Sequence, residues 1–232
     1  MPKFMRAAVL GGVVLLSGGL VGVAARDAWA QPHELPAQIV TLGGAAEMNR
    51  KDTPAWKPAT LRADVGEGDS VRTQLGGRVT IRTASGQALR LGSRSQIAVM
   101  TTESTADAPG PTRIRLDSGW LWVAVTPGSP APTQIEVRAG PAVVTVRGAG
   151  VGLRRSADGG LLVQVHHGAA ACAGPDRQWE RTLTGPQQLV VPASGVPAQP
   201  VALAVDPLET TWVRWNADQD LAGGYGGKTA QP

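Results

Sequence analysis

Apolar and polar residues alternate along most of the chain between residues 61 and 192. In the segment RVTIR, Val79 and Ile81 fall on one face and the arginines fall on the other. This period of two is typical of half-buried strands, and it recurs in ALRL, QIAV, IEV and LLVQV. Turn residues such as Gly76-Gly77 separate the runs at intervals of roughly 8–12 residues. We therefore predict an all-β fold, a twisted β-hairpin, solenoid-like or sandwich-like stack of short strands.

The spacing of apolar residues changes near the C-terminus, where DPLETTWVRWNADQDLAGG predicts one amphipathic helix within residues 201–222. Leu208, Trp212 and Trp215 recur on one side of this helix. Asp206 is a candidate N-cap, followed by Pro207 and by Glu209 of a capping box. A helix this short is marginal alone, so it should rest on the β domain or dock on a partner. Gly223-Gly224 should end it, and residues 223–232 are predicted to form a flexible tail.

The first residues have the pattern of an export signal. Lys3 and Arg6 precede an uncharged apolar run, residues 7–25, and the Ala-Trp-Ala that ends at residue 30 fits a cleavage site. Residues 1–30 are predicted to be a signal peptide. The alternative is an uncleaved N-terminal anchor, because the run approaches the ~20 residues that span a bilayer. Either way, the rest of the chain is predicted to be periplasmic or secreted, with membrane contact only if the segment stays attached.

Two further segments interrupt the alternation. Residues 31–60 contain a short apolar stretch, QIVTLGGAAEM, which predicts a leading strand, and then a Pro-rich loop around Trp56. Residues 102–113, TESTADAPGPTR, are interpreted as a surface loop.

The stretch AVVTVRGAGVGLRRS places Gly148, Gly150 and Gly152 at a spacing that resembles a phosphate loop. A phosphate loop needs a helix directly behind it, whereas a hairpin-turn signal and another alternating run follow here. We therefore interpret the glycines as bends or close backbone approaches within a sheet, with Val144 and Val146 facing the core.

Composition and reactive side chains argue against several classes of function. The formal net charge is +4 and the basic residues are scattered, so no nucleic-acid partner is predicted. The single cysteine, Cys172, cannot form an internal disulfide and is expected to be buried. His166 and His167 should point to opposite faces of a strand, so neither a metal site nor a cofactor is predicted; His33 lies in the leading segment. Glu67 and Asp69 are interpreted as parts of a solvated turn, and the chain as a non-enzyme.

Trp120 and Trp122 share one face of the predicted strand GWLWVAV, whose other face is apolar as well. The strand is therefore either covered on both sides, with the C-terminal helix as the natural cover, or its tryptophans form an exposed platform for a sugar ring or a partner strand. With Trp212 and Trp215, they are the candidate binding residues.

The segment VGEGDSVRTQLGGRVTIRTASGQALRLGSRSQI resembles the opening of a FecR domain, with Gly68, Asp69 and Thr73 at the family's Gly-Asp-x-ϕ-x-Thr positions. The segment IEVRAGPAVVTVRGAGVGL is similar to the family's Val-Arg-Gly segment. Arg147 and Gly148 occupy the matching positions of that segment. On this basis residues 61–200 are assigned to a FecR-like β domain.

The resemblance implies a role at the cell envelope, because the family's namesakes are envelope signal transducers. They combine a cytoplasmic part that binds a sigma factor, a membrane helix and a periplasmic FecR domain. Six residues precede the apolar run here, so we expect no direct anti-sigma activity. We predict a non-catalytic protein-binding or scaffolding module, including a part in envelope signalling, that contacts another envelope protein or a cell-wall polymer. The alternative is a carbohydrate- or peptidoglycan-binding module that uses exposed Trp residues.

Overall fold

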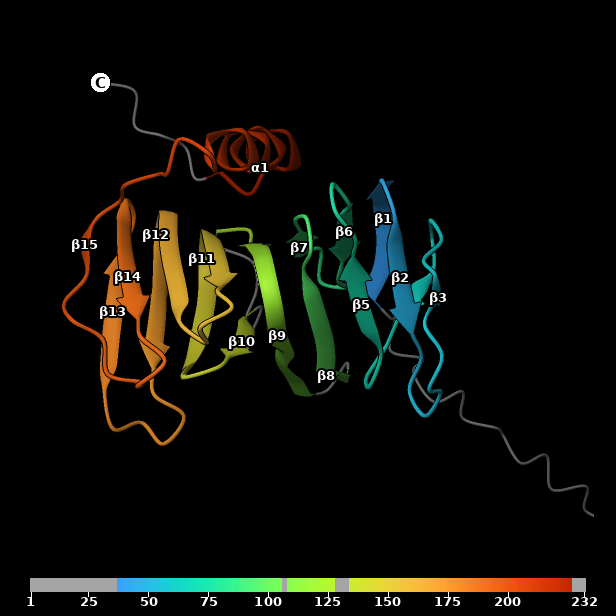
Figure 1. Cartoon of the computed structure of the whole chain (residues 1–232), viewed down its shortest axis with the longest axis horizontal. Coiled ribbons are helices and arrows are strands. Elements are labelled where there is room, and N and C mark those ends of the chain that lie inside the picture. Colours follow the sequence, from blue (N-terminus) through green and yellow to red (C-terminus); the bar gives the residue numbers. More distant parts are fainter. Residues whose placement is uncertain (1–36, 106–107, 128–133, 227–232) are drawn as a thin grey trace, which may run out of the picture. The chain divides into compact units, whose positions relative to one another are not determined.

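A computed structural model describes residues 37–105, 108–127 and 134–226 of the chain. The predicted signal peptide, His33 and the end of the predicted tail lie outside these residues. Within them, fifteen strands belong to one continuous sheet, and one helix, α1 (Thr210–Gly223), follows the last strand (Figure 1). The predicted all-β class with a C-terminal helix is confirmed.

The strands are, in chain order, β1 (Ala37–Gly43), β2 (Ala46–Asn49), β3 (Lys57–Pro58), β4 (Asp64–Val65), β5 (Ser70–Thr73), β6 (Arg78–Arg82), β7 (Ala88–Leu91), β8 (Gln96–Thr105), β9 (Ala108–Ala124), β10 (Ile135–Ala139), β11 (Ala142–Arg155), β12 (Leu161–Ala173), β13 (Glu180–Thr184), β14 (Gln187–Val191) and β15 (Val201–Ala202). The pairing of β10 with β9 is parallel. The other pairings between described strands are antiparallel.

The sheet folds back on itself because three long strands change partners halfway along. The first part of β9 pairs with β8 and β10, and its last residues, from Gly119 onward, pair with β7 and β11. The first part of β11 pairs with β10, and its last part pairs with β9. The first part of β12 pairs with β14, and its last part pairs with β13. These three strands therefore pass from one layer of the sheet into another.

We call the two parts of the sheet the first and second layers. The first layer contains β4, β1, β6, β7, the last part of β9, the last part of β11, the first part of β12, β14 and β15. The second layer contains β3, β2, β5, β8, the first parts of β9 and β11, β10, the last part of β12 and β13. Each layer has one face toward the other layer and one outer face.

The hydrophobic core lies between the two layers, because alternate side chains of both layers point toward each other. Leu89 and Leu121 of the first layer and Leu116 of the second are among the largest fully buried side chains, and all belong to one core cluster. Val144 and Val146 are completely buried in the same cluster, as their alternation predicted. Cys172 is buried as well, and burial raises the pKa of its thiol to about 12.

Each of the three shared strands bends at a glycine with positive φ. These are Gly119 (φ 77°) in β9, Gly148 (φ 57°) in β11 and Gly168 (φ 75°) in β12. Glycine adopts such angles without the steric cost that a Cβ atom imposes. Gly148 and Gly168 also touch, since a Cβ at residue 168 would lie closer than 3.0 Å to the backbone of residues 148 and 149. The interpretation of Gly148 as a bend is confirmed.

The prediction of a surface loop at residues 102–113 was wrong. Strand β8 continues to Thr105, β9 begins at Ala108, and the two strands pair to their ends as a long hairpin. Backbone pairing extends the ladder here although the sequence contains Pro and Gly and lacks apolar alternation, so the pattern gave no sign of it.

The start of the C-terminal helix also differs from its prediction. The segment 201–222 begins with β15, and α1 starts only at Thr210. Asp206 caps the preceding turn, where its Oδ1 accepts a hydrogen bond from the Leu208 amide at 2.9 Å. Leu208 is 93% exposed and does not belong to the packed face of the helix. The helix ends at Gly224 in the left-handed conformation, as the Gly-Gly pair predicted.

Among the described residues, no helix has the length and apolar character needed to cross a membrane.

Replacing Gly168 with Ala should destabilise the fold more than the same change at Gly86. Both glycines have a strongly positive φ, but no atom lies within 4 Å of the Cβ position at residue 86. We expect G86A to cost about 1–2 kcal/mol for backbone strain, and G168A to cost a further ~1–3 kcal/mol for overpacking. Urea unfolding of the two variants measures the difference. Equal losses would contradict the assignment of residue 168 as a packed bend.

Candidate functional site

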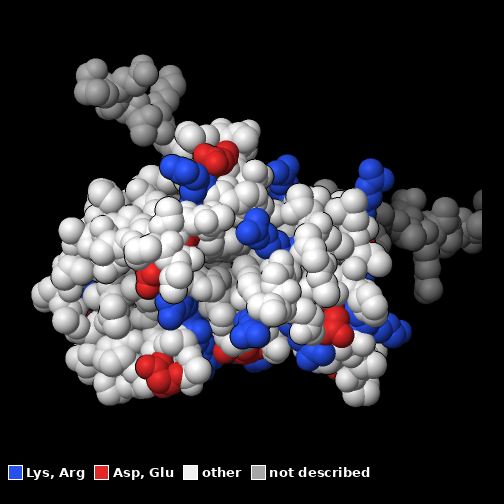
Figure 2. Space-filling model, turned by 45° about the horizontal axis from the view of Figure 1, so that its top comes forward, with Lys and Arg blue, Asp and Glu red and all other residues white. Residues whose placement is uncertain are grey.

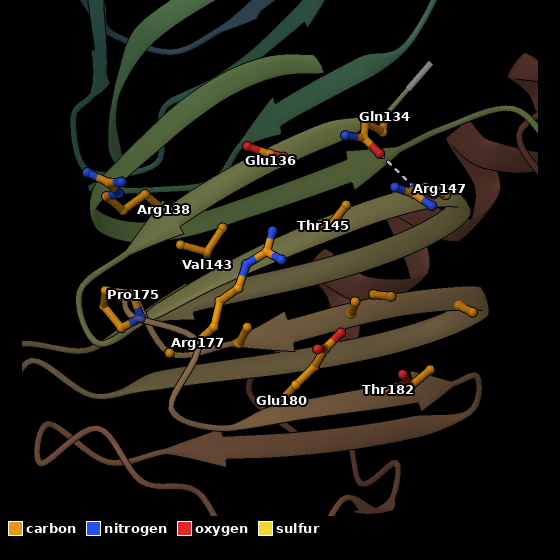
Figure 3. Close-up of a pocket in the computed structure, with 15 residues that line it drawn as sticks. Gln134, Glu136, Arg138, Val143, Thr145, Arg147, Pro175, Arg177, Glu180 and Thr182 are labelled. Carbon is orange, nitrogen blue, oxygen red and sulfur yellow. Dashed lines mark hydrogen bonds between the residues drawn. The ribbon is translucent and has the colours of Figure 1, made fainter. Parts of the chain in front are cut away.

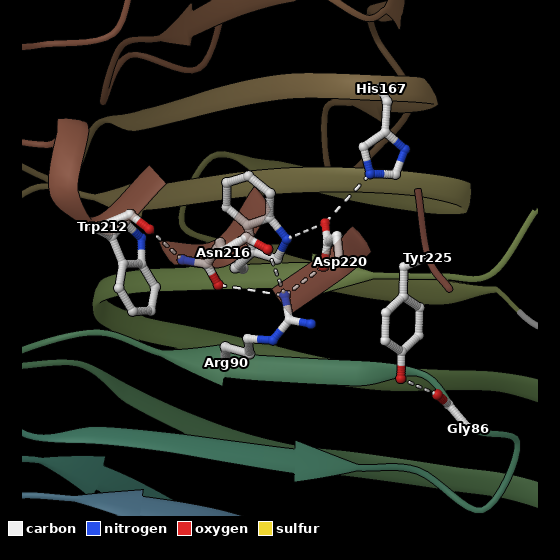
Figure 4. A network of polar contacts seen from close by, with 8 residues as sticks. Gly86, Arg90, His167, Trp212, Asn216, Asp220 and Tyr225 are labelled. Atoms are coloured by element: carbon white, nitrogen blue, oxygen red, sulfur yellow. Dashed lines mark hydrogen bonds and ion pairs between the residues drawn. The ribbon is translucent and has the colours of Figure 1, made fainter. Parts of the chain in front are cut away.

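The two outer faces of the sheet differ, because α1 covers one of them and leaves the other open. Arg90 of β7 points away from the core to which its neighbours Leu89 and Leu91 belong. Its Nη1 atom lies 2.5 Å from Oδ1 of Asp220 in α1 (Figure 4). Both side chains are at most 3% exposed, so this is a buried ion pair between the helix and the first layer.

The second oxygen of the Asp220 carboxylate is also bound. The indole Nε1 of Trp122 donates to Oδ2 at 3.0 Å, and Nε2 of His167 lies 3.4 Å from the same oxygen (Figure 4). A Cβ at Gly150 would lie closer than 3.0 Å to both His167 and this carboxylate. Gly150 is therefore a close backbone approach, as the glycine pattern predicted, and it leaves room for the Asp220 network.

Further contacts hold the helix at both ends. The Tyr225 hydroxyl donates to the carbonyl oxygen of Gly86 at 2.5 Å, just beyond the end of α1. Glu209, before the helix, forms an ion pair with Arg154 of β11. Burial raises the pKa of Glu209, and the neighbouring Arg154 opposes this shift. The helix is therefore attached to the sheet by polar and ionic groups as well as by the packing of Trp212 and Val213 against the buried cluster that contains Trp122.

Some buried polar atoms near α1 have no hydrogen-bond partner among the described residues. These side-chain atoms are Gln164 Oε1, His166 Nε2 and Trp212 Nε1. The His166 ring stacks at a tilt on Trp122, with 4.6 Å between the ring centroids. Burial lowers the pKa of His166 from 6.5 to about 4, so its imidazole is neutral at pH 7.

The two histidines approach the same side of the sheet, contrary to the expectation of opposite faces. The pairing of β11 with β12 shifts register on both sides of Gly150, and this bulge lets His166 reach Trp122 while His167 reaches Asp220. Within the described parts of the chain, no group of three or more His, Cys, Asp or Glu side chains could hold a metal ion.

The candidate tryptophans lie at or beneath the helix. Trp122 is 1% exposed, so the arrangement is the covered one and not the exposed pair that the carbohydrate-binding alternative requires. Trp120 is half-buried below Arg154, whose guanidinium lies 5.3 Å from the ring centroid. Trp212 and Trp215 are half-buried and stack on each other at 5.4 Å.

The positions of the Gly-Asp-x-ϕ-x-Thr motif have structural roles. Asp69 is 5% exposed and accepts hydrogen bonds from Arg50 Nη1 at 2.8 Å and from the amides of Lys51 and Gly66 at 2.9 Å. The prediction of a solvated turn was wrong for Asp69, because these donors satisfy the carboxylate inside the fold. Glu67 is exposed, as expected.

The two other residues of this motif fix neighbouring loops. Gly68 has a φ of 84°, and a Cβ there would collide with the Lys51 side chain. The Thr73 hydroxyl donates to the carbonyl oxygen of Gly92 at 2.5 Å and accepts from the amide of Ser95 at 2.9 Å. The motif therefore joins the turns that precede β5 and β8.

The outer face of the second layer carries a groove of about 590 Å³ over β10, β11, β12 and β13 (Figure 3). Its residues form three rows across the strands. The first row is Arg138, Val143, Ala173 and Glu180, the second is Glu136, Thr145, Ala171 and Thr182, and the third is Arg147 and Ala169. Small alanine side chains on β12 form the floor, and longer side chains on β10 and β13 form the walls.

The charged groups of the groove are unevenly paired. Glu136 forms an ion pair with Arg113 at 3.0 Å, and Arg147 Nε donates to the neutral amide oxygen of Gln134 at 2.7 Å. The guanidinium groups of Arg138 and Arg177 have no ion-pair or hydrogen-bond partner in the part of the chain that the structure describes. In Figure 3, Arg177 extends over the groove toward Thr145. The groove therefore has an excess of positive charge. Elsewhere, the basic side chains in view in Figure 2 are spread as separate spots with acidic groups between them.

Sequence reasoning identified the tryptophans but missed the ion pair that holds them under the helix. Arg90 sits in an alternating run, where a polar residue is ordinarily solvent-facing, and Asp220 looks like part of a solvated helix stripe. The available signal is the spacing of Trp212, Asn216 and Asp220, which places two polar residues in line with a tryptophan on one helix face.

Comparison with known proteins finds a family match for part of the sheet. Residues 69–171 match the family described as FecR protein. No curated protein matches the sequence. Two crystal structures of a candidate anti-sigma factor from Parabacteroides distasonis ATCC 8503, at 1.65 Å and 2.50 Å resolution, have a similar fold. Each is 17% identical with a TM-score of 0.51, over 67% of this chain and 74% of the other. This similarity concerns the fold.

Replacing Asp220 with Asn should release α1 while the sheet stays folded. The change leaves the buried Arg90 charge without its counter-ion, which typically costs about 3–5 kcal/mol. Undocking of the helix would return Arg90 to water. We expect amides of α1 to lose hydrogen-exchange protection while amides of β9 and β11 keep theirs. D218N, on the exposed side of the same helix, should change protection by less than about 0.5 kcal/mol. Unchanged protection of α1 in D220N would contradict the proposed attachment.

The stability of the protein should fall as the pH falls from 6.5 to about 4, because of His166. In this window the unfolded chain binds a proton at His166 and the native state, with its lowered pKa, does not. The contribution has a slope of at most about 1.4 kcal/mol per pH unit. Urea unfolding at several pH values should show a steeper fall for the wild type than for H166Q. Parallel curves would show that His166 is not the titrating group.

Proposed function

Because residues 69–171 match the FecR family, we propose that this protein is an exported, non-catalytic module that binds another protein at the cell envelope, with a part in envelope signalling. The family match supports a regulatory role over a catalytic one. The described polar groups support the same conclusion, since the densest cluster, around Asp220, is saturated by Arg90, Trp122 and His167 and serves to attach α1.

The observation that carries the proposal is the open outer face of the second layer. This face contains a groove of about 590 Å³ with charged walls and a floor of small side chains. The groove offers a concave surface to a partner. Part of the opposite outer face is occupied by α1, which buries Trp122 and Arg90 there. A binding role therefore assigns the partner to the face with the groove.

Pairing of a partner strand with a sheet edge has less support. The edge strands β3, β4 and β15 contain two residues each, and β3 includes a proline. Short edges and prolines are devices that discourage edge pairing. Strand β13, which borders the groove, is a longer edge, and it carries Glu180 and Arg181.

A carbohydrate-binding role for the tryptophans also lacks its main requirement. Trp122 is buried below α1 and donates its indole N–H to Asp220, so it cannot stack on a sugar ring while the helix is docked. A wall polymer remains a partner to be tested against a protein.

Site-specific photo-crosslinking tests the protein-binding role. Full-length protein with p-benzoylphenylalanine in place of Thr182, an exposed residue of the groove, should form one adduct of defined mass in cells that produce it. The same group in place of Ala157, in the exposed turn between β11 and β12, is the matched control and should form none. Absence of an adduct at residue 182, or cosedimentation of the protein with purified peptidoglycan that is lost when Thr182 is replaced, would contradict the proposal.

A further inference from the structure

The groove has the length and charge pattern of a site for one extended acidic segment. Walls β10 and β13 are separated by β11 and β12, which places their backbones about 14 Å apart at the usual strand spacing. This width accommodates one extended chain with its side chains. The floor consists of Ala169, Ala171 and Ala173, whose small side chains allow a backbone to lie close to the sheet.

Two cations of the groove, Arg138 and Arg147, lie in its end rows. Arg138 is in the first row and Arg147 is in the third, whereas Arg177 comes from the turn beside the first row and extends toward Thr145 of the second row. The first and third rows are four residues apart along the strands, which corresponds to about 13 Å. Glu136 lies in the row between them and is neutralised by Arg113.

This pattern constrains the sequence of a ligand. In an extended peptide, residues i, i+2 and i+4 point to the same side, and residues i and i+4 are about 13 Å apart. We propose that the groove binds an extended segment of a partner protein that has acidic residues at i and i+4 and an apolar residue at i+2. The acidic side chains meet Arg138 at one end and Arg147 at the other, the apolar side chain faces the alanines, and Arg177 extends over the groove between the two ends.

Most arginines of the groove lack an ion-pair partner within the described part of the chain, and this favours an acidic ligand over a basic one. Arg138 and Arg177 have no counter-ion among the described residues, and Arg147 is bound only to a neutral amide. Glu180 lies in the same row as Arg138 but two strands away, and its carboxylate has no ion-pair partner among the described residues either. The three arginines of the groove outnumber this one unpaired carboxylate. A carboxylate that enters the groove therefore gains charge-assisted hydrogen bonds from guanidinium groups that are not already paired.

The inference rests on the proposed protein-binding function and is tested apart from it. The probes are acetyl-ESVSE-amide, its isomer acetyl-SEVES-amide with the acidic residues two apart, and acetyl-KSVSK-amide. Full-length protein with carbon-13 alanine methyl groups reports the site through the signals of Ala169, Ala171 and Ala173. We expect acetyl-ESVSE-amide to shift these signals and to bind at least fivefold more tightly than either other peptide, with affinity that falls as salt rises.

Charge reversal supplies the control variants. R138E/R177E should weaken binding of acetyl-ESVSE-amide at least fivefold, while R82E, at an exposed position of β6 in the first layer, should leave it unchanged. An unchanged alanine methyl spectrum of each free variant verifies its fold. Equal binding of the three peptides, shifts confined to the α1 side, or full affinity in R138E/R177E would overturn the inference. If R138E/R177E still crosslinks from residue 182, the acidic ligand is wrong and the protein-binding role stands. If the wild type forms no adduct, that role fails whatever the peptides do.

Discussion

The architecture depends on the left-handed backbone at Gly119, Gly148 and Gly168. These residues let β9, β11 and β12 change direction, so that one continuous sheet closes over a single core. Without the bends, the long strands would form one flat layer, and their apolar side chains would have no second layer to pack against. The apolar residues on both sides of each bend, such as Val146 and Val151, instead reach the same interior. The stabilising burial between the layers is a consequence of backbone geometry at these three positions.

The two outer faces are then distinguished by charge chemistry. On the first layer, the buried Arg90–Asp220 pair attaches α1 and places Trp122 under it. A pair with both partners buried needs its hydrogen bonds to be complete, and Trp122 and His167 complete those of Asp220. On the second layer, the ion pairs lie along the exposed face and leave some guanidinium groups unneutralised. The molecule therefore has one outer face that α1 covers in part and one outer face that carries the groove.

Much of the fold follows from the sequence, because period-two burial is a local property. The alternation located most strands and identified Val144 and Val146 as buried, and the turn chemistry of Gly224 marked the end of α1. The burial of Cys172 was expected because a single cysteine cannot form an internal disulfide. The folding of the sheet into two layers could not be read, since it depends on which strands pair. For the same reason the hairpin at residues 102–113 was missed, as its ladder is held by backbone groups.

The candidate site was less accessible to sequence reasoning. The burial of Trp122 under the helix was one of the two predicted arrangements. Both faces of its strand are apolar, so each face needs another part of the protein to bury it. The role of Arg90 and Asp220 was not, since 130 residues separate them and each alone fits a solvated position. The burial of Asp69 was hidden in the same way, because its donors come from Arg50 and Lys51, outside the motif. Buried polar groups are identified by their partners, and partners distant in sequence become visible only in the fold.

Strand β11 carries Arg147 on the face with the groove and, three residues later, Gly150 against the Asp220 carboxylate on the face under α1. The bend at Gly148 lies between them. The peptide units at this bend thus act as a common pivot for both surfaces, and a rotation there displaces a wall of the groove and the seat of the helix together. The connection is made by covalent backbone, over less than one strand length, and needs no chain of side-chain contacts through the core.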